Sequence, residues 1–107
     1  MALQIEPGEE PGVLRLVGEL DMSTVPVAEE AFAQIVDGPA RLTADLSALD
    51  FLDSSGVRLL LKVLTDCRER GGDLVMRAPT PPVRRLFDLL ELDANGVIIE
   101  PDSGGES

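Results

Sequence analysis

The residues best placed to do chemistry lie in the stretch LDFLDSSGV, residues 49–57, where small or polar residues interrupt an apolar region. They are Asp53, Ser54, Ser55 and Gly56, and a leucine-rich helical pattern follows them. Aspartate and serine oxygens cap helices, because they accept hydrogen bonds from the unpaired N–H groups of the first turn. The same N–H groups and the helix dipole accommodate a phosphate, which would add about 1.5 to 2 negative charges at pH 7. The stretch therefore indicates either a helix cap alone or a cap that also carries a charge switch.

Histidine-dependent nucleophilic catalysis is excluded by the residues that the sequence lacks. The chain has no histidine, so it cannot build a Ser-His-Asp or Cys-His arrangement or a histidine metal site. Neither the nucleophile motif G-x-S-x-G nor the phosphate-binding loop G-x-x-x-x-G-K-[ST] occurs, and Lys62 is expected to face solvent. Asp45 and Asp50, expected to flank a strand, are typical of solvated turn residues rather than metal ligands. We therefore predict no catalytic residue, no metal site and no cofactor.

Composition and charge describe one acidic globular domain. The 107 residues suffice for a single core, built from Leu, Val, Ile and Ala because the chain has three Phe and neither Trp nor Tyr. The net charge of -11 disfavours nucleic acid and anionic lipid surfaces and suits a partner with a basic face. The single cysteine, Cys67, cannot form an intramolecular disulfide and is expected to be a buried helix residue. Without a signal peptide or an apolar run of about 18 residues, the sequence predicts a cytoplasmic protein with no membrane insertion.

Alternating and helical patterns predict the element order β-β-α-β-α-β-α-β. The expected strands are 2–6, 13–20, 41–46, 73–78 and 97–100, with a loop over 47–53 and a disordered tail over 101–107. The expected helices run from a cap at Ser23 or Thr24 to Gly38-Pro39, from about 55 to 70, and onward from Thr80-Pro81-Pro82. The fold class is then α/β, with a mixed, mostly parallel sheet that opens with a β-hairpin and is packed by three or more helices. Partners usually act at the carboxyl edge of such a sheet, which is where Ser54 and Ser55 fall.

Each predicted helix carries an apolar face. The second helix should bury Val57, Leu60, Leu61 and Leu64, and Gly71-Gly72 should end it. The Leu59–Val63 pair beside this face could be packed or exposed. The faces expected on the other two helices are Ala28, Ala31, Phe32 and Ile35, and Val83, Leu86, Phe87 and Leu90.

Two motifs together resemble a known family. VGELDMST (residues 17–24) and LDFLDSSGVRLLL (49–61), followed by VRRLFDLLEL (83–92), are similar to the STAS-domain anti-sigma factor antagonists. The resemblance spans about Ile5 to Ile99 and implies a STAS domain over 1–100. It implies that Ser54 is the phosphoacceptor, and that Asp21 together with Asp53, Ser54, Ser55 and Gly56 contacts the partner. The implied partners are an anti-sigma factor with serine kinase activity and a PP2C-type phosphatase. Unphosphorylated antagonist would bind the anti-sigma factor and release a sigma factor.

An alternative function stays open at this point, namely a non-phosphorylated STAS subunit of a membrane ABC transport complex that moves lipids. A response-regulator receiver is disfavoured, because the chain opens with a hairpin and its last lysine is Lys62. Family members commonly carry a further helix after the last strand, whereas PDSGGES (101–107) is not expected to form one. The sequence leaves both a monomer and a weak dimer open.

Overall fold

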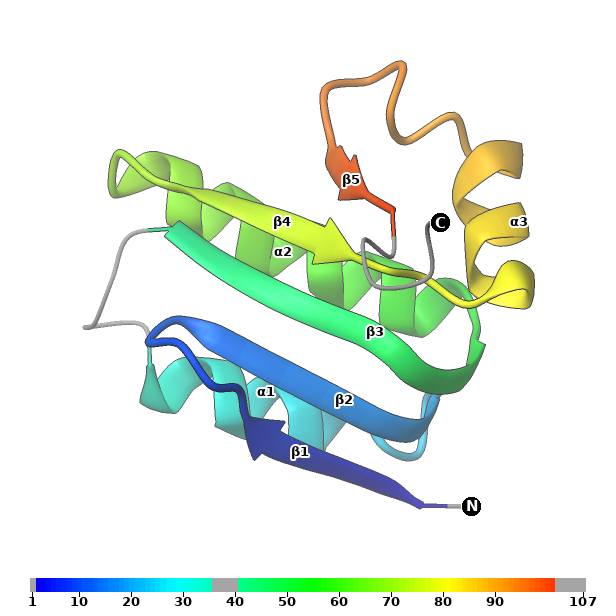
Figure 1. Ribbon diagram of the computed structural model, residues 1–107, viewed down its shortest axis with the longest axis horizontal. Coiled ribbons are helices and arrows are strands. Elements are labelled where there is room, and N and C mark those ends of the chain that lie inside the picture. Colours follow the sequence, from blue (N-terminus) through cyan, green and yellow to red (C-terminus); the bar gives the residue numbers. More distant parts are fainter. Residues whose placement is uncertain (1, 36–40, 102–107) are drawn as a thin grey trace.

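The fold is a sheet with helices packed against it, and the predicted element order is confirmed (Figure 1). The computed structural model describes residues 2–35 and 41–101, which contain a five-stranded sheet and three helices. The predicted helix stop at Gly38-Pro39 and the predicted tail beyond Pro101 lie outside these residues. The elements are β1 Leu3–Pro7, β2 Val13–Leu20, α1 Val25–Gln34, β3 Arg41–Leu52, α2 Ser54–Glu69, β4 Asp73–Arg77, α3 Pro81–Leu89 and β5 Ile98–Glu100.

The sheet has the strand order β1-β2-β3-β4-β5, with β1 antiparallel to β2 and every later neighbour parallel. The opening hairpin closes where the N–H of Gly8 donates to the carbonyl of Val13 at 2.8 Å. Gly12 ends the connection with a φ of 85°, which a residue without a Cβ adopts without strain. Because β2, β3 and β4 run parallel, their carboxyl ends meet at one edge of the sheet. That edge carries the residues after β2 and after β3.

Strand β3 is longer than predicted. The sequence indicated a short strand over 41–46 and a loop over 47–53, but β3 continues through Leu52. The pairing of β3 with β2 shifts register twice, and these irregularities accommodate the polar residues that had indicated a loop. Asp45 and Asp50 therefore lie within the strand rather than flanking it. The extension carries the chain directly from the sheet into α2.

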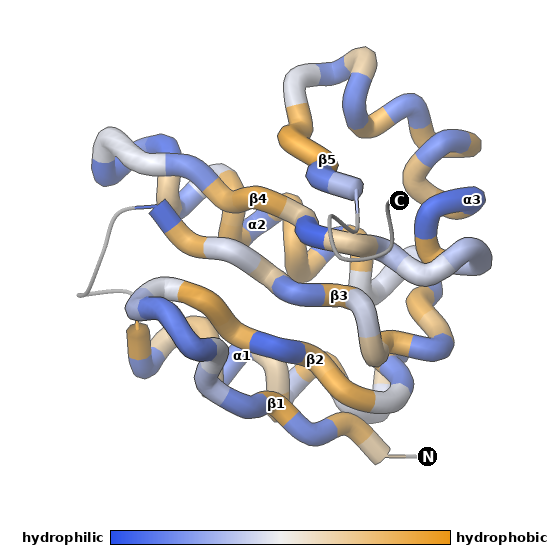
Figure 2. Tube along the Cα trace, viewed as in Figure 1, coloured by the Kyte–Doolittle hydropathy of each residue, from blue (hydrophilic) through white to orange (hydrophobic). Residues whose placement is uncertain are grey.

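The two faces of the sheet differ in polarity. Apolar and polar residues alternate along β2 and β3 (Figure 2). Helices α1 and α2 lie behind the sheet in the view of Figure 1 and contribute buried residues to the core on the apolar face. The opposite face carries, in register from β1 to β5, residues of alternating charge: Glu6, Arg15, Asp45, Arg77 and Glu100. Opposite charges facing each other across strands favour this strand order, because like charges in those positions would repel.

Helix α2 buries a wider face than predicted. Val57, Leu60 and Leu64 are buried as expected, whereas Leu61 is half-buried. The further buried residues of this helix are Gly56, Leu59, Val63 and Cys67. The face is wide because α2 contacts β3, β4 and α1 together. The Leu59–Val63 pair is thus core, and so is Cys67.

Helix α3 is anchored to the middle of the sheet by its N-cap residue. The hydroxyl of Thr80 donates to the carbonyl of Leu49 at 2.7 Å, and Val83 and Phe87 are buried as predicted. Leu90, also predicted to be buried, is 44% exposed. The expectation fails for Leu90 because the helix ends at Leu89 and the chain turns away there.

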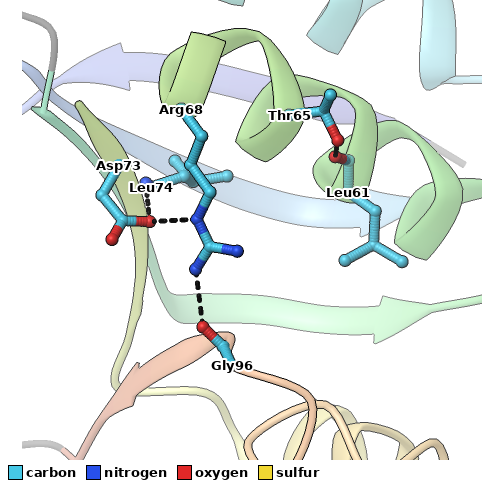
Figure 3. A network of polar contacts seen from close by, with 6 residues as sticks. All are labelled: Leu61, Thr65, Arg68, Asp73, Leu74 and Gly96. Atoms are coloured by element: carbon cyan, nitrogen blue, oxygen red, sulfur yellow. Dashed lines mark hydrogen bonds and ion pairs between the residues drawn. The ribbon is translucent and has the colours of Figure 1, made fainter. Parts of the chain in front are cut away.

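The carboxyl end of α2 is tied to two other segments through Arg68 (Figure 3). Its Nε donates to Oδ1 of Asp73 at 3.2 Å, and its Nη2 donates to the carbonyl of Gly96 at 2.6 Å. The same Asp73 oxygen accepts from the N–H of Leu74. One arginine thus fixes the end of α2, the start of β4 and the turn before β5. The predicted stop at Gly71-Gly72 is confirmed, with Gly71 at a φ of 85°.

Candidate functional site at the carboxyl edge of the sheet

The candidate site lies where β2 and β3 end side by side. Leu20 and Leu52 are register partners at these ends, and the next residues are Asp21 and Asp53. The N–H of Asp53 donates to the carbonyl of Leu20 at 3.3 Å, which joins the two strand ends. The two predicted motifs, far apart in sequence, therefore meet at one edge of the sheet.

Asp53 is the N-cap of α2. One carboxylate oxygen, Oδ1, accepts from the N–H of Ser55 at 2.9 Å, the hydroxyl of Ser55 at 2.6 Å and the N–H of Gly56 at 3.1 Å. The Ser55 hydroxyl, followed by these two N–H groups, holds the pKa of Asp53 below its ordinary value, against the opposing effects of partial burial and the charge of Asp21. The carboxylate is therefore the form that the folded protein stabilises.

Asp21 makes the same turn at the end of β2. Its Oδ1 accepts from the N–H of Ser23 at 2.9 Å, the hydroxyl of Ser23 at 2.7 Å and the N–H of Thr24 at 3.2 Å. The hydrogen bond from the Ser23 hydroxyl is the main reason that the pKa of Asp21 is lowered. We call this arrangement an aspartate–serine turn; the site contains two of them, Asp21–Ser23 and Asp53–Ser55. Because the charge of Asp21 raises the pKa of Asp53, the two carboxylates form one acidic patch.

The cap of α1 differs from the prediction in its chemistry. Thr24 is the N-cap residue and Pro26 lies in the first turn, as expected, but the Thr24 side chain makes no hydrogen bond to the helix. Its hydroxyl instead donates to the carbonyl of Glu19 at 2.9 Å and accepts from the N–H of Asp21 at 2.9 Å. Thr24 therefore closes the loop onto β2 and makes the Asp21–Ser23 turn rigid.

The two serines of the motif differ in the freedom of their hydroxyls. Ser55 is half-buried, and its hydroxyl is held by Asp53. Ser54 is exposed at the first residue of α2, and its hydroxyl makes no hydrogen bond to the part of the chain that the structure describes. Of the two serines, Ser54 is therefore the one whose hydroxyl is accessible and not held by Asp53.

Gly56 is buried because α2 begins in close contact with the sheet. A Cβ at this position would lie 2.5 Å from Cδ1 of Leu52, 2.8 Å from Cγ of Leu20 and 3.1 Å from the carbonyl oxygen of Leu20. Its visible role is to let the first turn of α2 approach both strand ends. A direct contact of Gly56 with a partner stays a prediction, as do the predicted contacts of Asp21, Asp53, Ser54 and Ser55.

A small hollow of about 230 Å³ adjoins the acidic patch and was not predicted. It lies between the two helices that begin at the site, and it also has two cationic residues, Arg58 and Lys62, in its lining. Lys62 is exposed as predicted, with its Nζ 4.0 Å from an oxygen of Glu29 on α1. Its apolar lining residues are Met22, Val25 and Leu59. The similarity of Asp21-Met22-Ser23 to Asp53-Ser54-Ser55 is the signal in the sequence that could have pointed to Met22.

The groups that the structure describes at this edge can accept a transferred group or contact a partner, and they do not form a metal site or a thiolate nucleophile. Across residues 2–35 and 41–101, no three acidic or cysteine side chains gather closely enough to hold a metal ion. Cys67 is 1% exposed, and burial raises the pKa of its thiol, so the thiolate nucleophile is disfavoured there. No helix within the same residues has the length and apolar character needed to cross a membrane. What the edge presents is a free hydroxyl beside two carboxylates.

Comparison with known proteins identifies the class. Residues 3–100 match a family described as "Mlab, STAS domain". The chain is 45% identical over 85 residues to the anti-sigma-F factor antagonist RsfB of Mycobacterium tuberculosis, covering 76% of this chain and 66% of that relative. A solved anti-sigma factor antagonist from Mycobacterium paratuberculosis superposes with a TM-score of 0.78 at 31% identity, over 96% of this chain and 87% of the other. The phosphorylated form of the Bacillus cell fate determinant SpoIIAA shares the fold, with a TM-score of 0.69 at 21% identity, over 96% and 94% of the two chains.

The fold and the site together define a STAS domain. The chain belongs to the STAS-domain family, and its relatives are anti-sigma factor antagonists, which are regulatory proteins rather than enzymes. The resemblance seen in the two motifs is confirmed. The matched segment spans just under two thirds of RsfB.

Proposed function

We propose that the protein binds an anti-sigma factor while Ser54 is unphosphorylated, and that phosphorylation of Ser54 ends this binding. The observation that carries the proposal is the contrast between the two serines: the Ser54 hydroxyl is exposed and free, whereas that of Ser55 is held by Asp53. Binding would displace the sigma factor from the anti-sigma factor. The protein would then act as a competitor and a kinase substrate in the cytoplasm, without catalytic groups of its own.

The electrostatics of the edge support a switch by charge. Asp21 and Asp53 already make the site acidic, and a phosphate on Ser54 would add about 1.5 to 2 negative charges. A loss of about 1,000-fold in affinity corresponds to about 4 kcal/mol. Like charges brought together at an interface oppose binding by several kcal/mol, so one phosphate facing a carboxylate of the partner is sufficient.

The proposed partners follow from the class of the protein. The kinase is the anti-sigma factor itself, and a PP2C-type, metal-dependent phosphatase restores the free serine. RsfB is named an anti-sigma-F factor antagonist, and SpoIIAA has been solved in a phosphorylated form. Both support a partner-switching role for this chain.

The test uses the two serines as a matched pair. With the cognate anti-sigma factor and ATP, we expect mass spectrometry to find one phosphoryl group on the wild type and on Ser55→Ala, and none on Ser54→Ala. We also expect Ser54→Glu to bind the anti-sigma factor far more weakly than Ser54→Ala in a titration. Incorporation that persists in Ser54→Ala, or equal affinity of the two variants, would contradict the proposal. Recovery of an ATPase and a permease from cells, with Ser54 unmodified, would favour the transport alternative.

A further inference from the structure

Met22 is an apolar side chain held out into solvent. It is 78% exposed, the highest value among the large apolar residues that the structure describes. It is not on a loose loop: the hydrogen bonds of the Asp21–Ser23 turn surround it, and the Thr24 hydroxyl binds this turn to β2. A side chain presented from a rigid turn loses little conformational freedom when a partner binds it.

Met22 occupies the middle position of its turn. In both aspartate–serine turns of the site the first and third residues bond to each other, and the middle residue is exposed at the end of the strand. Met22 is the middle residue of one turn and Ser54 is the middle residue of the other. The two turns thus place an apolar group and a free hydroxyl in equivalent positions on adjacent strand ends.

The two positions belong to one continuous surface. Met22 lines the 230 Å³ hollow between α1 and α2 together with Ser55, the neighbour of Ser54. Val25 and Leu59 supply further apolar lining there, and Arg58 on α2 lies one turn after Ser54. A partner that contacts Ser54 and extends over this hollow would also contact Met22.

We propose that Met22 is the apolar anchor of the docking surface and is buried in an apolar pocket of the anti-sigma factor. This inference rests on the proposed function, because it places the anchor in the interface that Ser54 controls. The occupant is chosen by continuity with Ser54: Met22 follows Asp21 directly and lines the same hollow as Ser55, so the matching pocket is apolar, and its rim faces both the acidic patch and the cationic Arg58 and Lys62. Phosphorylation of Ser54 would act by keeping Met22 out of that pocket.

The test is a titration of the anti-sigma factor with four proteins. Met22→Gln should bind about 10- to 100-fold more weakly than the wild type, because burial of an apolar side chain of this size is lost. Met22→Leu should bind within about threefold of the wild type, since the two side chains have similar volume and polarity. Leu89→Gln is the matched control, because Leu89 is 73% exposed on α3 and does not line the hollow. It should bind like the wild type, and circular dichroism should show all four folded.

Oxidation by hydrogen peroxide tests the role of the Met22 side chain without a mutation. Hydrogen peroxide transfers one oxygen to the sulfur of methionine; the O–O bond breaks, sulfur is oxidised by two electrons, and water is released. Met76 is 1% exposed, so within the described residues Met22 is the methionine open to this reaction. Treated wild type should lose affinity as Met22→Gln does, whereas treated Met22→Leu should keep it.

The outcomes separate this inference from the proposed function. If Met22→Gln binds like the wild type while Ser54→Glu still blocks binding, the anchor is refuted and the switch stands. If Ser54→Glu binds like the wild type, the switch fails whatever Met22 does. If Met22→Gln instead abolishes self-association in sedimentation and leaves anti-sigma binding unchanged, Met22 anchors a second copy of this chain and the proposal is overturned.

Discussion

The substitution Asp53→Ala tests whether the motif stabilises the fold as well as carrying the switch. Asp53 caps α2, a helix of 16 residues that contacts β3, β4 and α1. Alanine removes the acceptor for both N–H groups at the cap and for the Ser55 hydroxyl. Loss of an N-cap oxygen destabilises a protein by about 1 kcal/mol, and loss of a carboxylate from a helix amino terminus adds about 0.3 to 1 kcal/mol. Relief of the repulsion from Asp21 offsets part of the second contribution.

We therefore expect Asp53→Ala to lower the free energy of unfolding at pH 7 by about 1 to 1.5 kcal/mol. Thermal and urea unfolding, followed by circular dichroism, measure the change. For a chain of this size, 1 kcal/mol corresponds to a fall in Tm of about 4 °C. Asp53→Asn keeps an oxygen acceptor and removes the charge, so it should fall between the wild type and alanine.

The difference in stability between the wild type and Asp53→Ala should depend on pH with a definite sign. The folded protein lowers the pKa of Asp53, so its carboxylate contributes stability that is fully present above the unfolded value of about 3.9. That contribution is lost as the pH falls through the folded value. The gap between the wild type and Asp53→Ala should therefore be constant near neutral pH and should narrow below about pH 4. A gap that widens on acidification would contradict the assignment of the carboxylate as the cap.

Asp45→Ala is the matched control for this prediction. Asp45 makes a third aspartate–serine turn, accepting from the N–H of Ser47 at 3.0 Å and its hydroxyl at 2.8 Å, but it lies within β3 and precedes no helix. It should destabilise the protein by less than Asp53→Ala. If the two substitutions have equal effects, the helix cap is not the source of the stability, and the reasoning about Asp53 is refuted.

Two further predictions concern the backbone. Gly56→Ala should lower the free energy of unfolding by about 1 kcal/mol, because overpacking against Leu20 and Leu52 exceeds the gain in helix propensity. Overpacking typically destabilises by about 1 to 3 kcal/mol, and the helix-propensity gain is about 1 kcal/mol. Leu52→Val should relieve part of the effect in a double-mutant cycle, and a Gly56→Ala protein more stable than the wild type would contradict the close approach of α2 to the sheet. Glu91→Gly should raise the free energy of unfolding by about 0.5 to 1 kcal/mol in urea melts, because Glu91 adopts a φ of 55° after α3, where glycine is unstrained. The matched opposite change is Gly71→Ala, after α2, where the φ is 85° and an added Cβ would meet nothing within 4 Å. This substitution should lower the free energy of unfolding, and a change of the same sign at both helix ends would refute the backbone argument.

The parts of the site that the sequence predicted correctly depend on interactions within a few residues. The start of α2 at Asp53-Ser54 follows from the capping chemistry of adjacent side chains, and its end follows from the left-handed conformation at Gly71. The same locality explains why Phe87 and Leu60 were correctly predicted to be buried from helical spacing alone. The length of β3 was not predictable in this way, because polar residues such as Ser47 indicate a loop unless a neighbouring strand accommodates them through a register shift.

Taken alone, the sequence determined where the helices begin, where α2 ends, the alternation of the strands and the presence of two similar acidic motifs, since each of these is set by neighbours along the chain. Only the tertiary structure decided that the two motifs meet, because the parallel pairing of β2 with β3 brings Asp21 and Asp53 to one edge. It also decided which serine hydroxyl is free and that Met22 is exposed, because hydrogen bonding and burial depend on a geometry that the order of residues does not specify.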